Sequence, residues 1–336
     1  MILVKKISIL ILFVFIVLYS IFRPKYDNHI IEGHAFGTTY SVNIYDKDFN
    51  QESLKMEIDS LINLINLDMS TYISHSNISV INKSEKGSYI ISEHFRKVLG
   101  KALAYCTMSD FYDITILPLM NIWGFGPENE FIVPNQSTIN KTLEFVNYNF
   151  LELSEGSLMK KDNKVQIDLN SLAKGYSVDL IGEFLSSKKL NNYLIEVGGE
   201  ILAKGLNKKT QSIWTLGIQD PLNHDKYIET VRLSNKALAT SGNYRKYRID
   251  PKTGERYVHT INPITGLTSK NNTLSVSVVS KDCITSDAWA TALLTLDLDR
   301  GRAIVDQTES LDALWIISVN EKVEIIKSKN WDKLTN

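Results

Sequence analysis

The chain has 336 residues, with 37 lysines and arginines against 38 aspartates and glutamates, and a formal net charge of −1. Its apolar content of 43 % is enough to bury a core, which excludes a disordered chain. Because the charge is balanced and no long basic run is interleaved with aromatic residues, we do not expect nucleic acid as a partner. The two cysteines match no metal-ligand spacing, and Cys106 lies on an apolar helical stripe that predicts a buried thiol.

The N-terminus carries an apolar run over residues 7–22, closed by Arg23 and Lys25. Counted from Met1, the apolar stretch has about the 20 residues that a bilayer span needs. No small-x-small cleavage site follows the run, so an uncleaved signal anchor over residues 1–25 is favoured over a removed signal peptide. Basic residues flank both ends and leave the orientation open by the positive-inside rule. We expect an anchor in the inner (cytoplasmic) membrane and residues 26–336 as one domain on the periplasmic side, because such leading segments normally direct the rest of the chain across the membrane.

The apolar periodicity beyond the anchor predicts both strands and helices. Residues 40–45 alternate with period two, which is typical of a strand. Asn50 and Ser92 are each expected to cap a helix with one apolar face. Turn chemistry at residues 162–163 predicts a hairpin within 157–169. Further strands are predicted at 193–197, 200–204, 213–219, 230–233, 274–280, 313–319 and 323–327, and helices at 171–187, 285–294 and 300–307. This mixed order predicts an α+β fold, a single mixed α/β domain with a mainly antiparallel sheet, preceded by the N-terminal anchor helix.

The segment "DLNSLAKGYSVDL" joins a helix start to a lysine and a glycine one turn in. Asn170 or Ser171 is a plausible N-cap, and a helix N-terminus offers free N–H groups to an anion. Gly175 costs about 1 kcal/mol relative to alanine inside a helix, which makes sense if a flat group or a strand must approach the backbone. The alternative is that Gly175 is a packing contact and Lys174 a solvated charge.

Two shorter stretches also carry chemistry. Gly198 and Gly199 interrupt a predicted strand just before Glu200, which marks either a place where backbone lies against a ligand or a bulge without one. His259 joins a titratable imidazole to a Pro/Gly turn in "HTINPITG", although an isolated histidine beside a turn is more often a surface residue.

A pair of oxygen donors lies in "SDAWATALL". Asp287 and Thr291 are spaced i,i+4, which on a helix puts a carboxylate and a hydroxyl on one face. Such hard oxygen donors suit Mg²⁺, which takes few protein ligands and completes its octahedron with waters and phosphate oxygens. The alternative is that Ser286 or Asp287 simply caps the helix.

These stretches follow one another in the order of a known family. The matching segments are "FGTTY", "DMSTY", "YDITILPLMNIWGFGP", "IDLNSLAKGYSVD", "VGGE", "WTLGIQDP", "ALATSGNYRKY", "HTINPITG" and "SDAWATAL". Over about residues 33–294 the chain resembles the FAD:protein FMN transferases, the ApbE family. Each piece alone is weak, but the combination is highly specific.

The resemblance implies an enzyme that binds FAD, cleaves its pyrophosphate with Mg²⁺ and releases AMP. It implies transfer of FMN, through a phosphoester, to a threonine or serine in a flavinylation motif of a partner redox protein. The implied metal ligands are Ser171, Asp287, the carbonyl of Ala290 and Thr291. The implied contacts with FAD are Phe36, Tyr72, Phe111, Tyr112, Asp113, Asp168, Lys174 and Ile261, and we add Gly198, Gly199 and Glu200 as the place of close backbone approach. The family often has a Gly-Ala pair where Asp110 and Phe111 stand, so Phe111 is expected to reshape the flavin pocket.

The attacking hydroxyl must lose a proton, which calls for a group whose pKa lies near the working pH. His259 is our candidate for this base, with Asp168 as the alternative. Lys174 would add positive charge at the phosphates, where phosphoryl transfer depends on charge neutralisation. Two alternatives stay open: a module that binds FAD without transferring it, and hydrolysis of FAD to FMN and AMP at the same site.

Overall fold

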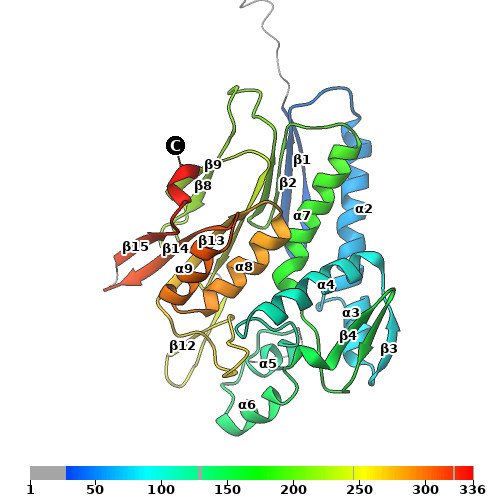
Figure 1. Ribbon diagram of the computed structural model, residues 1–336, viewed down its shortest axis with the longest axis vertical. Helices are drawn as coiled ribbons and strands as arrows, with labels where there is room; N and C mark the ends of the chain where they lie inside the picture. Colours follow the sequence, from blue (N-terminus) through cyan, green and yellow to red (C-terminus); the bar gives the residue numbers. More distant parts are fainter. Residues whose placement is uncertain (1–27, 128–130, 245, 321, 336) are drawn as a thin grey trace, which may run out of the picture.

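The computed structural model describes residues 28–127, 131–244, 246–320 and 322–335. Its central feature is an eight-stranded sheet with the order β1-β2-β6-β7-β10-β13-β14-β15, in which all neighbours are antiparallel (Figure 1). The strands of this sheet are β1 (His29–Ala35), β2 (Thr38–Ile44), β6 (Tyr193–Val197), β7 (Glu200–Lys204), β10 (Lys236–Gly242), β13 (Thr273–Ser280), β14 (Asp312–Val319) and β15 (Lys322–Lys327). The predicted mixed fold with a mainly antiparallel sheet is confirmed.

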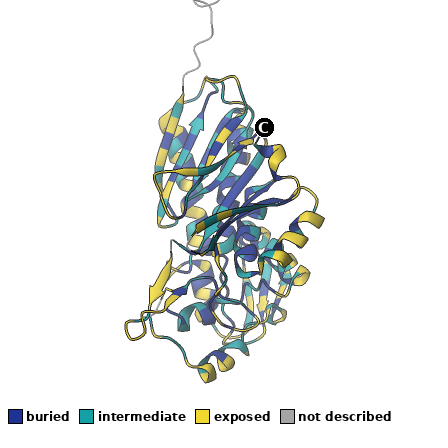
Figure 2. Ribbon diagram, turned by 90° about the vertical axis from the view of Figure 1, so that its left-hand side faces the viewer, coloured by how far each residue is buried: buried dark blue, intermediate teal, exposed yellow. Residues whose placement is uncertain are grey.

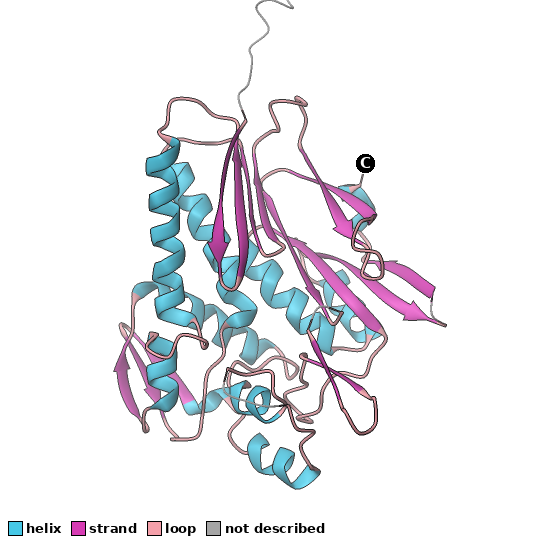
Figure 3. Cartoon of the chain, turned by 180° about the vertical axis from the view of Figure 1, so that it is seen from behind, coloured by secondary structure: helices cyan, strands magenta, loops and turns pink. Residues whose placement is uncertain are grey.

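One face of the sheet is covered by four helices, which lie in front of it in Figure 1 and behind it in Figure 3. They are α2 (Gln51–Met69), α7 (Asn170–Ser187), α8 (Cys283–Thr295) and α9 (Leu298–Gln307). Helix α7 contacts β6 and β7, α8 contacts β10 and β13, and α9 contacts β14. Helices α7 and α8 also contact each other, so together they form a pair of helices that covers the middle strands of the sheet.

The opposite face of the sheet is covered by a separate hairpin and a short C-terminal helix. These elements are β8 (Trp214–Gln219), β9 (Tyr227–Leu233) and the 3-10 helix η2 (Trp331–Leu334). Trp214 and Val231 pack here against Leu238 and Leu314 of the central strands. The central strands β13 and β14 are therefore buried almost throughout, while the edge strands β1 and β15 keep exposed residues (Figure 2).

The remaining elements form a smaller layer beyond the ends of α2 and α7 (Figure 1). They are α3 (Asn77–Lys83), β3 (Gly87–Ile90), α4 (Glu93–Met108), α5 (Leu117–Ile122), α6 (Gln136–Leu143), η1 (Tyr148–Phe150), β4 (Leu151–Ser154) and β5 (Ser157–Lys160), with the hairpin β11 (Tyr247–Ile249) and β12 (Arg256–Val258) beside them. Strands β3, β5 and β4 form a three-stranded antiparallel sheet.

The predicted helix starts at α2 and α4 are confirmed at the level of single hydrogen bonds. Asn50 Oδ1 accepts from the amide of Ser53 at 2.9 Å, and Ser92 Oγ accepts from the amide of Phe95 at 3.0 Å. Cys106 is a free, buried thiol, as its apolar stripe predicted. Local capping chemistry of this kind is readable from sequence because it involves residues only three positions apart.

Three local predictions are wrong. The predicted hairpin at residues 162–163 does not form, because β5 pairs with the preceding strand β4 through a turn at Gly156 (φ 76°). Asp162 instead accepts a hydrogen bond from the amide of Lys164 in a local turn. Neither Asn170 nor Ser171 caps α7, because the helix already includes Asn170 and Leu169 occupies the cap position. Helix α8 begins earlier than predicted. Its cap is Asp282, so Ser286 and Asp287 lie inside the helix.

The predicted anchor over residues 1–25 lies outside the described residues. Among the helices that the structure does describe, none combines the length and apolar character that a bilayer span requires.

Candidate active site

Helices α7 and α8 are joined so closely that only glycine fits between them. The amide of Gly175 donates to Asp287 Oδ2 at 2.9 Å. A Cβ at Gly175 would lie 2.5 Å from the carbonyl oxygen of Cys283 and 2.8 Å from Asp287 Cβ. The group that approaches this glycine is therefore a helix, so the packing reading of Gly175 is confirmed.

A second contact locks the start of α8 onto α7. Asp179 accepts hydrogen bonds from the amides of Cys283 at 2.7 Å and Ile284 at 2.8 Å, two of the donors that a helix N-terminus leaves unpaired. Together with the Gly175 contact, this clasp fixes Asp287 relative to the first turns of α7.

Two buried carboxylates and one lysine meet at this joint. Lys174 of α7 forms an ion pair with Glu200, the first residue of β7. Glu200 is 1 % exposed and Asp287 is 2 % exposed, and burial raises the pKa of both carboxyls against the attraction of Lys174. Burial opposes the charge of Lys174 as well, but attraction to Glu200 and then Asp287 outweighs it and raises the lysine pKa. Lys174 is thus an ion-paired group, and the solvated-charge reading is wrong.

The paired glycines before Glu200 form a tight turn. Gly198 and Gly199 have φ values of 59° and 103° and connect β6 to β7, so the strand reverses there and contains no bulge. The neighbouring turn between β1 and β2 holds Phe36, whose φ is 52°. Because β2 pairs with β6, these turns lie at the same end of the sheet. A cavity of about 550 Å³ opens there, lined by His34, Ala35, Phe36, Gly37, Thr38, Thr39 and Asn66.

The implied metal ligands lie on facing parts of the same helical pair. Asp287 and Thr291 are one turn apart on α8, and Thr291 Oγ1 lies 3.2 Å from Ser241 Oγ of β10. Ser171 Oγ, on the first turn of α7, lies 2.6 Å from the hydroxyl of Tyr112. No group of three His, Cys, Asp or Glu side chains that could hold a metal occurs in the part of the chain that the structure describes. A cation here would depend on one carboxylate, two hydroxyls and the Ala290 carbonyl.

The charge balance at the α7–α8 joint also suits a divalent cation. Glu200 Oε2 is buried without a hydrogen-bond partner among the described residues. With Asp287 nearby, the joint holds two carboxylates against the single ammonium group of Lys174. Buried carboxylates require compensation by cations or hydrogen bonds, so the charge balance of the joint favours an added positive charge.

Both candidate bases lie within electrostatic reach of Lys246. Asp168 is buried; its amide donates to the Ile114 carbonyl at 2.7 Å and its Oδ1 accepts from the amide of Asn170 at 2.7 Å. Burial raises the pKa of Asp168, and Lys246 opposes that rise. Burial, together with repulsion from Lys246, lowers the pKa of His259 to about 4, so the ring is neutral at neutral pH. This pKa is below the value near the working pH that was expected of the base, so His259 is a weaker base than an ordinary histidine.

The hydrogen bond of His259 determines which ring nitrogen carries the proton. Nδ1 lies 3.2 Å from the carbonyl oxygen of Lys246. A carbonyl oxygen can only accept, so Nδ1 is the donor. The lone pair on Nε2 is therefore the one available to accept a proton.

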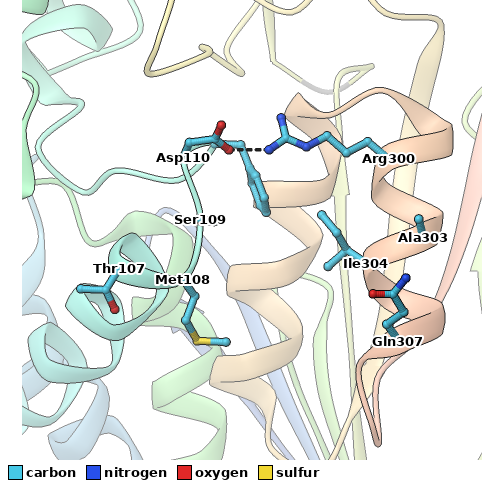
Figure 4. A pocket seen from close by; sticks show the side chains of 9 residues that line it. Thr107, Met108, Ser109, Asp110, Arg300, Ala303, Ile304 and Gln307 are labelled. Carbon is cyan, nitrogen blue, oxygen red and sulfur yellow. Dashed lines mark hydrogen bonds and ion pairs between the residues drawn. The ribbon is translucent and has the colours of Figure 1, made fainter.

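The segment that carries Phe111, Tyr112 and Asp113 is held from two sides. Phe111 packs against Trp289 with ring centroids 6.3 Å apart, and Arg300 lies over its ring while pairing with Asp110 at 2.6 Å. This ion pair borders an open cavity of about 510 Å³ between α9 and the end of α4 (Figure 4). Both carboxylate oxygens of Asp113 are already engaged, in hydrogen bonds to the amide and hydroxyl of Thr115 and to the amide of Tyr148.

The other two implied FAD contacts, Tyr72 and Ile261, lie around Phe125. Tyr72 is 59 % exposed, with its hydroxyl 3.4 Å from the Phe125 carbonyl oxygen. Ile261 is buried in the same apolar cluster as Phe125, whose ring centroid lies 6.4 Å from that of His259.

Comparison with known proteins identifies the family. The family model described as "ApbE family" matches residues 36–315. The chain belongs to the ApbE family. It is 32 % identical over 305 residues to the FAD:protein FMN transferase of Vibrio cholerae serotype O1, covering 89 % of this chain and 90 % of that protein. The FAD:protein FMN transferase of Haemophilus influenzae is 30 % identical over 319 residues, covering 91 % of each chain.

Solved ApbE structures share this fold. The flavin transferase ApbE from Vibrio cholerae superposes with a TM-score of 0.84 at 30 % identity, over 92 % of this chain and all of that one. The apo form of the Pseudomonas stutzeri flavinyl transferase ApbE gives a TM-score of 0.84 at 27 % identity, over 92 % and 97 % of the two chains. The resemblance inferred from the ordered motifs is confirmed.

Sequence reasoning missed two residues at the site of this ApbE chain. Lys246 lies inside the "ALATSGNYRKY" motif, whose basic residues were a usable signal. Asn82 gave no signal at all. Its side chain pairs in both directions with the backbone of Ile167, accepting from the amide at 2.7 Å and donating to the carbonyl at 2.8 Å, and so holds the residue before Asp168.

Proposed function

We propose that this chain is an FAD:protein FMN transferase that attaches FMN to a threonine or serine of a partner redox-protein domain and releases AMP. The observation that carries the proposal is the buried cluster of Lys174, Glu200 and Asp287 at the α7–α8 joint, with a neutral histidine near it. Relatives with the printed name FAD:protein FMN transferase match along most of the chain.

The joint would hold Mg²⁺ through the Asp287 carboxylate, the hydroxyls of Thr291 and Ser171, and the carbonyl of Ala290. When bound, the ion would neutralise charge on the pyrophosphate oxygens, which is the main requirement of phosphoryl transfer. Support comes from the hard oxygen donors and from the excess of buried carboxylate over ammonium charge.

The remaining steps are assigned to side chains of this chain. Lys174 would place its ammonium group beside the phosphates. The acceptor hydroxyl oxygen forms a bond to the phosphorus of the FMN half, the bond from that phosphorus to the AMP oxygen breaks, and AMP departs. His259 Nε2 would take the proton of the hydroxyl, with Asp168 as the alternative base.

The membrane location is part of the same proposal. Residues 1–25 would anchor residues 26–336 to the inner membrane with the enzyme on the periplasmic side. The support is the apolar run in the sequence, long enough for a bilayer span, and its basic flanks.

The test incubates the full chain in detergent with FAD, Mg²⁺ and a redox-protein domain that carries a threonine acceptor. We expect the acceptor to gain the mass of FMN, with one AMP released per modification, and both signals to disappear with EDTA and return with excess Mg²⁺. AMP without a gain in acceptor mass would show hydrolysis, and intact bound FAD would show a binding module; either result would contradict the transferase.

A further inference from the structure

The β11–β12 hairpin is a two-stranded unit beside the site. No other strand among the described residues pairs with it. Its register places Arg248 opposite Tyr257, Tyr247 opposite Val258 and Ile249 opposite Arg256. Because directly opposed residues share a face, Arg248 and Tyr257 lie on one face and the other two pairs on the second.

The first face packs on the protein. Tyr257 is buried against Trp123 and Phe131, with ring centroids 5.3 and 6.0 Å apart. Arg248 lies over the ring of Phe125 at 5.5 Å and donates to the Gly124 carbonyl at 3.2 Å. These contacts fix the orientation of the hairpin and leave its second face outward.

The outward face has the composition of a contact surface. Tyr247 is 41 % exposed and Ile249 is 55 % exposed, where a two-stranded hairpin on the protein surface normally carries polar residues. The guanidinium of Arg256 stacks on Tyr247 at 4.1 Å and donates to the Asn243 carbonyl at 2.8 Å, so the pair is ordered before any partner arrives. Tyrosine and arginine are the residue types enriched where protein partners bind most strongly. Figure 2 shows most of the hairpin as exposed.

The base of the hairpin lies at the candidate active site. Strand β11 directly follows Lys246 and β12 directly precedes His259, and the amide of His259 donates to the Lys246 carbonyl at 3.3 Å. A protein whose hydroxyl reaches the phosphorus beside His259 must also cover the surface that begins at these residues. The hairpin is thus the part of the surface that such a protein meets first.

We propose that the outward face of β11–β12 is the docking surface for the acceptor protein. This inference rests on the proposed transferase function. Apart from the inward-facing Arg248, residues 246–258 carry three basic side chains (Lys246, Lys252 and Arg256) and two acidic ones (Asp250 and Glu255), and Glu255 is already paired with Lys270 at 2.7 Å. The acceptor that fits it has an apolar side chain flanked by carboxylates next to the hydroxyl residue that is modified.

The test compares transfer by the parent, a Tyr247→Ser/Ile249→Ser double variant and a matched control, Ile90→Ser/Met159→Ser. The control removes two exposed apolar side chains from the β3–β5 sheet. The acceptor is the same redox-protein domain with a threonine acceptor that tests the proposed function. We expect the hairpin variant to raise KM for the acceptor at least tenfold with kcat and FAD affinity unchanged, and the control to match the parent.

A charge variant provides a second measurement. Lys252→Glu, at the exposed tip, is expected to raise KM for the acceptor at low salt and to lose that effect at high salt, because exposed charges are screened within about 10 Å at 0.1 M.

Four results would overturn the proposal. An unchanged acceptor KM in the double variant would exclude the surface while leaving the transferase intact. A loss of FAD affinity, or a lowered Tm beyond that of the control, would assign the hairpin a structural role. A parent dimer that the double variant converts to a monomer would make a second copy of this chain the occupant. A parent that modifies no acceptor would remove the transferase function and the docking surface together.

Discussion

The amide of Gly175 and the carboxylate of Asp287 are joined by a 2.9 Å hydrogen bond across the α7–α8 contact. The contact is possible because glycine leaves no Cβ between the two helices. Asp287 is thereby held by backbone rather than by a mobile side chain, so its position follows directly from helix packing. The same helix contact therefore packs α7 against α8 and sets the position of Asp287 in the proposed metal site.

Gly175→Ala should destabilise the protein and weaken metal binding together. The new methyl group would meet the Cys283 carbonyl oxygen and force the helices apart, at about 1–3 kcal/mol of unfolding free energy. Gly100→Ala, also in a helix, is the matched control. Its Cβ would approach only Leu153 Cδ2, at 3.4 Å, so the change should be neutral or stabilising by about 0.4–1 kcal/mol. Urea unfolding and Mg²⁺ titration of FAD cleavage measure both effects; equal behaviour of the two variants would contradict the close joint.

Asn82→Ala should displace Asp168 indirectly, through the backbone of Ile167. The substitution leaves the buried amide and carbonyl of Ile167 without their partner, which destabilises the protein by about 1–3 kcal/mol for each unsatisfied group. Because Asp168 is the next residue, FAD affinity should fall as well. Asn140→Ala, on the exposed side of α6, serves as the control and should change neither quantity. Flavin fluorescence titration together with denaturant unfolding gives the measurement, and a stable variant with parental FAD affinity would refute this positioning role.

His259 should titrate far below an ordinary histidine. Its pKa is about 4 in the folded protein, against about 6.5 in the unfolded chain, because burial and Lys246 disfavour the imidazolium. As the pH falls, the unfolded chain therefore binds this proton before the folded protein does. The free energy of unfolding should decrease as the pH is lowered from about 6.5 to about 4. As a base it would stay competent down to about pH 5. An NMR titration assigned with His259→Gln should give a midpoint near 4; a midpoint near 6.5 would contradict the neutral ring with its lowered pKa.

Local chemistry was readable from the sequence where the interacting residues are close in the chain. The caps at Asn50 and Ser92 were predicted, as was the i,i+4 spacing of Asp287 and Thr291. Strand β10 was not predicted, because its residues Lys236–Gly242 are mostly small, with one β-branched side chain (Thr240) and no aromatic one. It is a strand because β7 and β13 pair with it, while α8 lies on its face.

The site depends on contacts that no spacing reveals. Gly175 and Asp287 are 112 positions apart, and Asn82 and Ile167 are 85 apart. The turn chemistry at Asp162 was real but only local, since the pairing of β5 was decided by β4. The resemblance to the ApbE family supplied the site residues that spacing could not, because the family's motifs occur in this chain in the same order even though they are far apart in sequence.

The most direct measurement compares FMN transfer by the parent, Asp287→Asn and Asp312→Asn. Asp287→Asn keeps the shape of the side chain but removes the charge at the α7–α8 joint, and Asp312→Asn makes the same change at a buried carboxylate on β14. Acceptor mass and AMP are followed together with FAD binding. We predict that Asp287→Asn binds FAD but loses at least about 100-fold in transfer rate, a loss typical of removing an electrostatic contact to the transition state, while Asp312→Asn matches the parent. Parental transfer by Asp287→Asn would contradict the assignment of the active site to this joint.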